Sequence, residues 1–211
     1  FGEFNIENVV GTLGVLIGLG YSLEASAARV SGIRPVPGRM QRVECPSRQV
    51  IVDYAHTPDA LANSLKAARR HAQGDLWLVF GCGGNRDRGK RYDMGKVAAG
   101  FADHLVLTDD NPRDEDGQRI IEEILLGVGS KAATVMRDRR QAIRYAISMS
   151  CPEDLLLVAG KGHETTQEIA GVKYPFNDCE VVEESCRQLA DREVTPALKA
   201  SSLSHGGAAC C

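Results

Sequence analysis

The segment over residues 108–113, Thr-Asp-Asp-Asn-Pro-Arg, places carboxylates, an amide and a guanidinium on a few consecutive residues. An apolar run over 104–108 precedes it and predicts a strand, and helical spacing follows it. Open α/β sheets bind ligands at the carboxyl ends of their strands. Asn111 and Arg113 can grip a carboxylate with two prongs, and Asp110 can accept an ammonium. The segment therefore suits a zwitterion such as one end of an amino acid, although Asn-Pro and Asp-Asp also form turns.

A glycine-rich segment with four basic side chains, residues 81–91 (GCGGNRDRGKR), follows another expected strand. Glycines let backbone amides approach an anion closely. The spacing matches neither the phosphate loop of nucleotide-binding proteins nor the dinucleotide fingerprint. We expect this loop to face a phosphate or a carboxylate, and the alternative is a solvated basic loop.

Two more groups of polar residues stand at strand ends. Asp53 could accept both hydroxyls of a ribose, and His56 could reach a phosphate. The alternative is that Asp53 caps its own turn and His56 is a surface histidine. Residues 160–164, Gly-Lys-Gly-His-Glu, follow the most apolar strand and suit a polar ligand.

Strand-like and helix-like patterns alternate from residue 42 onward. Expected strands cover 49–53, 75–80, 104–108, 134–136 and 155–159. Expected helices begin after the caps Thr57, Asp138 and Asp178, and further helices cover 94–101 and the apolar positions after 117. This order predicts an α/β fold, a Rossmann-like, mostly parallel sheet with helices on both faces.

Both ends of the chain differ from this pattern. Residues 1–31 predict a strand remnant and a helix pair, whose apolar face would be Leu13, Leu16, Ile17, Leu23, Ala27 and Val30. Prolines stiffen a linker over 33–37. The expected domain covers 34–192, and the small polar residues of 193–211 predict a disordered tail.

The composition excludes several classes of protein. A hydrophobic content of 43% supports a core, and the net charge of −3 offers no basic stripe for nucleic acid. The longest apolar run, residues 9–21, is interrupted by four glycines, so we expect no membrane span. The first residues, Phe-Gly-Glu-Phe, resemble no signal peptide. We therefore expect the chain to begin inside a larger protein.

Seven cysteines are scattered along the chain, at 45, 82, 151, 179, 186, 210 and 211. No pair has Cys-x-x-Cys spacing, and no histidine stands at zinc-finger distance. We expect reduced thiols in the cytoplasm and no metal site.

Five segments in this order resemble the C-terminal third of a Mur ligase: GRMQ (38–41), DYAHTPDAL (53–61), GCGGNRDRGKR (81–91), DNPR (110–113) and AGKGHE (159–164). Within that family they are most similar to the type that adds meso-diaminopimelate to a UDP-N-acetylmuramoyl dipeptide. The likeness runs from about residue 1 to 189. It implies a Mur ligase C-terminal domain joined to a helical remnant, 1–33, of the central ATP-binding domain.

The resemblance also implies roles for individual residues. Arg86, Asn111 and Arg113 would receive the distal carboxylate of diaminopimelate. The carbonyl of Gly160 and the carboxylate of Glu164 would hold its distal ammonium.

A second set of residues would contact the nucleotide. By resemblance, Arg39, Asp53 and His56 look like nucleotide contacts, and Asn8 would read adenine. The alternative for Asn8 is a helix cap. Gln41 stands where the family usually has a glutamate, a departure that bears on charge pairing beside Arg39.

The implied reaction is ATP-dependent amide formation. ATP would phosphorylate the D-glutamyl γ-carboxylate, and the diaminopimelate amine would attack the acyl phosphate. The sequence contains no G-x-x-x-x-G-K-[ST] loop and no assignable carboxylate cluster. We therefore expect ATP and Mg²⁺ to be held by the central domain, and no catalytic or metal-binding residue in this chain, which would be inactive alone.

Two alternatives stay open at this point. One is another amide ligase of the superfamily, of the lysine-adding or folylpolyglutamate type. A lysine substrate has no second carboxylate, so Arg113 would lack its partner. The other is a non-catalytic binding module that has kept the fold.

Overall fold

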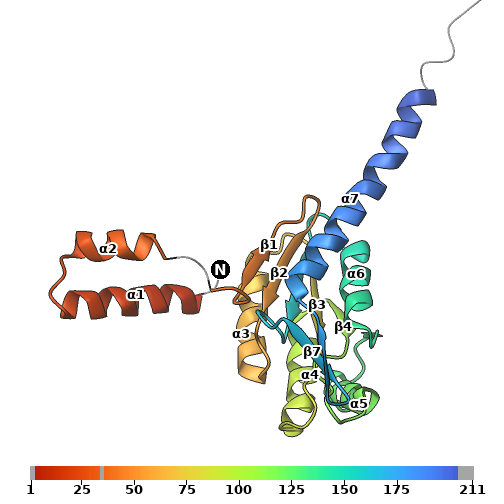
Figure 1. The fold of residues 1–211 in the computed structure, drawn as a ribbon, viewed down its shortest axis with the longest axis horizontal. Coiled ribbons are helices and arrows are strands. Elements are labelled where there is room, and N and C mark those ends of the chain that lie inside the picture. Colours follow the sequence, from red (N-terminus) through yellow and green to blue (C-terminus); the bar gives the residue numbers. More distant parts are fainter. Residues whose placement is uncertain (1–2, 34–35, 204–211) are drawn as a thin grey trace, which may run out of the picture.

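The structure, a computed structural model, describes residues 3–33 and 36–203 (Figure 1). Its central sheet has six strands in the order β1 (Gln41–Val43), β2 (Gln49–Asp53), β6 (Leu155–Ala159), β3 (Leu76–Phe80), β4 (His104–Leu107) and β5 (Thr134–Val135). Strand β1 is antiparallel to β2, and the other neighbours pair in parallel. The prediction of a mostly parallel α/β sheet is confirmed, and the antiparallel edge strand was not foreseen.

Helices cover both faces of this sheet (Figure 1). Successive side chains of a strand point to opposite faces, so an all-apolar strand needs cover on both. In β6, Leu155 and Leu157 belong to one core cluster, and Leu156 and Val158 belong to another. The first cluster packs under α3 (Pro58–Arg69), α4 (Gly89–Phe101) and α5 (Gly117–Val128). The second packs under α6 (Arg139–Met149) and α7 (Asp178–Leu203).

The helix starts agree with the sequence in two cases of three. Thr57 caps α3 and Asp138 caps α6, each by accepting a backbone N–H of the first turn. The prediction that Asp178 caps α7 is wrong. The side chain of Asn177 accepts the first amides of that helix, at 2.9 and 3.3 Å, and Asp178 is fully buried against Arg139.

A two-stranded hairpin, β7 (Thr166–Ile169) and β8 (Val172–Pro175), follows the last strand of the sheet. Its turn residues Ala170 and Gly171 both have positive φ, 49° and 73°. The backbone of Arg113 forms two hydrogen bonds with the hairpin, at 3.0 and 2.7 Å. The hairpin, which the sequence did not predict, therefore supports the loop that follows β4.

Two helices precede the domain, α1 (Glu3–Gly18) and α2 (Leu23–Ser31). They lie side by side and stand apart from the sheet (Figure 1). The expected helix pair is therefore present, and the described residues 3–33 contain no strand remnant. Much of the expected apolar face is exposed, Ile17 at 48% and Leu23 at 59%. That α1 and α2 belong to a central ATP-binding domain stays a prediction.

The last helix is longer than expected. We expected a disordered tail from residue 193, but α7 continues to Leu203. Residues 204–211 lie outside the described part of the chain. No helix in the described part is long and apolar enough to cross a membrane.

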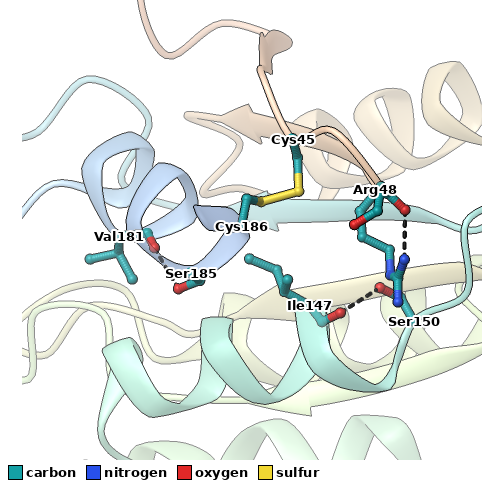
Figure 2. The surroundings of a disulfide bond; sticks show 8 residues. Cys45, Arg48, Ile147, Ser150, Val181, Ser185 and Cys186 are labelled. Carbon is teal, nitrogen blue, oxygen red and sulfur yellow. Dashed lines mark hydrogen bonds between the residues drawn. A yellow bond between two sulfur atoms is a disulfide. The ribbon is translucent and has the colours of Figure 1, made fainter. Parts of the chain in front are cut away.

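A disulfide joins Cys45, in the loop after β1, to Cys186 of α7 (Figure 2). The expectation of reduced thiols throughout is therefore wrong. The two cysteines are 141 positions apart in sequence, and the fold brings their Cα atoms to 5.3 Å, within the usual range for a disulfide. The free cysteines of the described chain are Cys82, Cys151 and Cys179.

Candidate functional site: a charged cavity at the carboxyl edge of the sheet

A cavity of about 460 Å³ opens where β2, β3, β4 and β6 end. Parallel strands end at the same edge of a sheet, so the loops that follow them meet there. The lining residues are Tyr54, His56, Thr57, Gly83, Arg86, Asp87, Lys90, Asp110, Asn111, Arg113, Gly160 and Glu164. The structure thus brings together all six residues that the sequence associated with the amino acid, from three separate loops.

The glycines of the 81–91 loop serve close packing between two loops. A Cβ at Gly81 would overlap the carbonyl oxygen of Thr108, and one at Gly84 would overlap that of Pro112. The amide of Gly84 donates to the carbonyl of Asn111 at 2.8 Å. These glycines therefore hold the loop after β3 directly against the loop after β4.

The four basic side chains of that loop divide into two groups. Arg86 and Lys90 line the cavity. Arg91 is fully buried and binds the carboxylates of Glu115 and Glu123 at 2.9 and 2.8 Å, and Arg88 pairs with Glu123. Arg86 and Lys90 can therefore contact an anion in the cavity. Arg88 and Arg91 instead anchor the loop to α5 and to the residues that precede α5.

Arg113 lines the cavity from a left-handed backbone conformation, with φ of 53°. Such a φ is unfavourable for a side-chain-bearing residue and persists where surrounding contacts impose it. The backbone hydrogen bonds between Arg113 and the hairpin supply these contacts. The guanidinium donates to the carbonyl of Gly84 at 2.7 Å and lies 3.5 Å from the carboxylate of Glu168.

Asn111 has its side-chain amide engaged inside the protein. Its Oδ1 accepts from Lys161 Nζ at 3.0 Å and from the amide of Glu168 at 2.9 Å. Its Nδ2 donates to Glu164 Oε2 at 2.9 Å. In this arrangement Asn111 orients its neighbours, and the geometry favours that role over the carboxylate grip we expected of it.

The acidic residues of the cavity have perturbed ionisation. Burial raises the pKa of Asp110, against the attraction of the Arg139 and Lys161 cations. Burial also opposes ionisation of Glu164, but hydrogen bonds from Lys161 and Asn111 outweigh it and lower the pKa of that carboxyl below its usual value. Glu164 is therefore an anion at neutral pH and can receive an ammonium.

Two residues that shape the site were given no role of their own from the sequence: Lys161, which was named only within the segment 160–164, and Gln167, which was not named. Lys161 is fully buried behind the cavity wall, and Gln167 donates to the backbone carbonyls of Asp109 and Asp110 at 3.2 and 2.8 Å. A signal for Lys161 was present, because it directly follows the most apolar strand. No comparable signal marks Gln167, which reaches the site only through the hairpin.

The carboxylate of Asp53 is engaged in hydrogen bonds within the protein. The residue is 4% exposed, and its carboxylate accepts hydrogen bonds from the amides of Met40 and Ala55 and from the hydroxyl of Ser64, at 2.7, 3.0 and 2.7 Å. The geometry therefore supports the structural alternative for Asp53, in which it fastens the turn after β2.

The other residues expected to contact the nucleotide differ in their position relative to the cavity. His56 lines the cavity, with Nδ1 2.9 Å from the carbonyl of Tyr54. Arg39 is exposed and stacks over the Tyr54 ring at 4.7 Å, beside the cavity. Asn8 is exposed on α1 and does not line the cavity. Their roles toward a nucleotide stay predictions.

The cavity can therefore hold a ligand that carries both charges. Arg86, Lys90 and Arg113 provide cations, and Asp110 and Glu164 provide carboxylates. Within the described chain, no group of three or more His, Cys, Asp or Glu side chains could hold a metal ion.

Residues 38–162 match the family model described as Mur ligase, glutamate ligase domain. This match covers more than half of the chain, so the chain belongs to the Mur ligase family. Its fold is that of the family's C-terminal domain.

Curated relatives with high identity share one name, UDP-N-acetylmuramoyl-L-alanyl-D-glutamate–2,6-diaminopimelate ligase. The protein of Alkalilimnicola ehrlichii is 53% identical over 86% of this chain and 36% of its own length, and that of Coxiella burnetii is 51% identical over 85% and 37%. A solved structure of the same name is 40% identical, covers 90% of this chain and 39% of its own, and superposes with a TM-score of 0.71. The chain thus spans little more than a third of the relatives it matches.

Proposed function

We propose that this chain is the amino-acid-binding portion of a ligase that joins meso-diaminopimelate to UDP-N-acetylmuramoyl-L-alanyl-D-glutamate in peptidoglycan precursor synthesis. The observation that carries the proposal is the cavity itself. Six residues predicted from the sequence line it, and they present cationic and anionic groups to one space. The names of the relatives support the same substrate.

The charges favour an amino acid with two zwitterionic ends. We propose that Arg113 and Arg86 bind the distal carboxylate of diaminopimelate, and that Glu164, Asp110 and the Gly160 carbonyl receive the distal ammonium. Lysine has the second ammonium without the second carboxylate, so it would leave the Arg113 guanidinium with only its internal contacts to the Gly84 carbonyl and the Glu168 carboxylate. This asymmetry favours diaminopimelate over lysine.

Enzymes of the Mur ligase family are ATP-dependent and use Mg²⁺. The described residues do not fit ATP or Mg²⁺ well. They offer no metal site, and the Asp53 carboxylate already accepts hydrogen bonds from within the protein. Residues of this chain therefore have no assigned part in phosphoryl transfer. We propose that the nucleotide and the metal are held by another part of a complete cytoplasmic enzyme, and that this chain binds and orients the amine nucleophile.

The test uses the complete ligase that contains this chain, with meso-diaminopimelate and lysine as competing substrates. Wild type should use diaminopimelate and reject lysine. A charge-assisted contact is worth roughly 1.5–3 kcal/mol, so Arg113→Ala should raise the KM for diaminopimelate about tenfold to a hundredfold. The KM values for ATP and for the UDP-linked dipeptide should change little.

Two further variants sharpen this test. Arg113→Lys should rescue poorly, because an ammonium cannot reproduce the guanidinium fork. Arg119→Ala removes an exposed arginine of α5 that does not line the cavity, so it should behave as wild type. Equal turnover of lysine and diaminopimelate by wild type would refute the proposed substrate.

A further inference from the structure

Lys161 is the least expected residue of the site, because a lysine ammonium is buried completely. Lysine is almost never buried in this way unless it is paired. Its Nζ lies 3.0 Å from Asn111 Oδ1, 2.9 Å from Glu164 Oε2 and 3.5 Å from Asp110 Oδ1. All three partners line the cavity, whereas Lys161 itself does not.

These contacts fix the orientation of Asn111. Its Oδ1 faces two donors, the Lys161 ammonium and the amide of Glu168. An inverted side-chain amide would place its NH₂ against both donors, so only the observed orientation satisfies them. That orientation in turn aims Nδ2 at Glu164.

Glu164 is held from two sides by the same arrangement. Lys161 and Asn111 both donate to Oε2, and the side chain remains 32% exposed beside the cavity. One carboxylate oxygen is therefore anchored, and the group keeps a set position relative to the loop after β4.

We propose that Lys161 is a positioning residue for substrate binding: it holds Asn111 and Glu164 in the arrangement that receives the ammonium of the amino acid. The inference rests on the proposed function and deepens it. Lys161 acts through its two partners and does not touch the substrate.

The charges around Lys161 explain why its ammonium is needed. Asp110 and Glu164 repel each other, and Lys161 lies between them. The neighbouring Arg139 and Asp178 are paired with each other at 2.7 Å. The positive charge of Arg113 also lowers the pKa of Glu164. Without Lys161, the buried carboxylate of Asp110 and the partly buried carboxylate of Glu164 would share one space without the cation that contacts both.

The pH dependence of substrate binding follows from this arrangement. Hydrogen bonds from Lys161 and Asn111 lower the pKa of Glu164 against the effect of burial. Without Lys161 the effect of burial gains weight, so the carboxyl ionises only at higher pH. The ammonium site would then fail at a pH where wild type still binds.

The experiment compares Lys161→Met with wild type in the complete ligase. The KM for meso-diaminopimelate should rise at least about tenfold at neutral pH, while the KM for ATP and for the UDP-linked dipeptide stays within about twofold. The acid limb of kcat/KM for diaminopimelate should move to higher pH by at least about half a unit. A purely structural lysine would lower stability without either change.

Lys131→Met is the matched control. The ammonium of Lys131 donates to the carbonyls of Ala99 and Ala102, at the end of α4 and away from the cavity. This variant also loses partly buried hydrogen bonds, and it should leave the KM for diaminopimelate and the acid limb unchanged.

A second variant covers the case in which Lys161→Met does not fold. Lys161→Met combined with Asp110→Asn removes one of the two unpaired carboxylates, and its KM is compared with that of Asp110→Asn alone. The double variant should again show the higher KM. A folded Lys161 variant with unchanged KM and acid limb would overturn the inference. A wild-type ligase that does not use diaminopimelate would instead refute the proposed function, before any variant is compared.

Discussion

Arg139 and Asp178 form an ion pair in which both side chains are fully buried. The guanidinium makes two bonds to the carboxylate, at 2.8 and 2.7 Å, and a third to the carbonyl of Ala159 at 3.0 Å. The pair links α6, α7 and the end of β6. A buried charge that loses its partner is costly, so this pair should be sensitive to single substitutions.

Asp178→Ala should therefore lower the free energy of unfolding by about 3–5 kcal/mol, because it leaves the Arg139 guanidinium buried and unpaired. Urea unfolding followed by circular dichroism measures the change. The control is Asp138→Ala, which removes only a helix cap and should cost about 1 kcal/mol. Replacing both partners, Arg139→Met with Asp178→Leu, should recover most of the loss. A cost for Asp178→Ala as small as that of the cap would contradict this account.

The hairpin β7–β8 is the element that supports Arg113. Its two turn residues, Ala170 and Gly171, both have positive φ, as a type I′ turn requires. Glycine adopts such a conformation readily, and alanine does so only at a cost. Gly171 therefore suits its left-handed backbone conformation, whereas Ala170 is strained in its own.

Ala170→Gly should stabilise the protein by roughly 0.5–1 kcal/mol, because it removes the strain of a left-handed alanine. The turn keeps its backbone hydrogen bond to Arg113, so the KM for the amino acid should stay unchanged. Thermal unfolding gives the stability. Ala99→Gly, within helix α4, is the opposite control and should destabilise by about 1 kcal/mol. A lower melting temperature for Ala170→Gly would show that the turn is not strained.

At the scale of the whole molecule, the disulfide joins the first and the last parts of the domain. Cys45 follows the edge strand β1, and Cys186 lies in α7 at the far end of the sequence (Figure 2). Ser185 next to it donates to the carbonyl of Val181 at 2.6 Å, within the same buried helix face. Cross-links that close long loops restrict the unfolded chain strongly.

Reduction of this bond should lower the free energy of unfolding by about 2–4 kcal/mol, since the unfolded chain regains the freedom of a long loop. Guanidinium unfolding with and without a thiol reductant measures the difference. Cys45→Ser should lose the same amount and should become insensitive to the reductant. If reductant lowers the stability of Cys45→Ser as much as that of wild type, the bond is not the cause.

Much of this protein follows from local patterns in its sequence. The apolar runs marked the strands, and Thr57 and Asp138 marked helix starts, because periodicity and capping act over a few neighbouring residues. Parallel strands end at one edge of a sheet, so the strand-end residues could be expected to meet. The fold class was therefore within reach of these local patterns, whereas Arg86, Gly160 and Glu164 were assigned to the amino acid through the family resemblance.

Other features depend on which distant groups the fold brings together. The burial of Lys161, the internal bonds of Asp53 and the pairing of Cys45 with Cys186 all arise between segments far apart in the chain. Asp178 was predicted to be a helix cap because its local sequence is typical of a cap. In the structure its carboxylate instead forms a buried ion pair with Arg139. A side chain's local pattern shows what it can bind. Its actual partner depends on packing and desolvation, which exist only once the sheet and its helices have assembled.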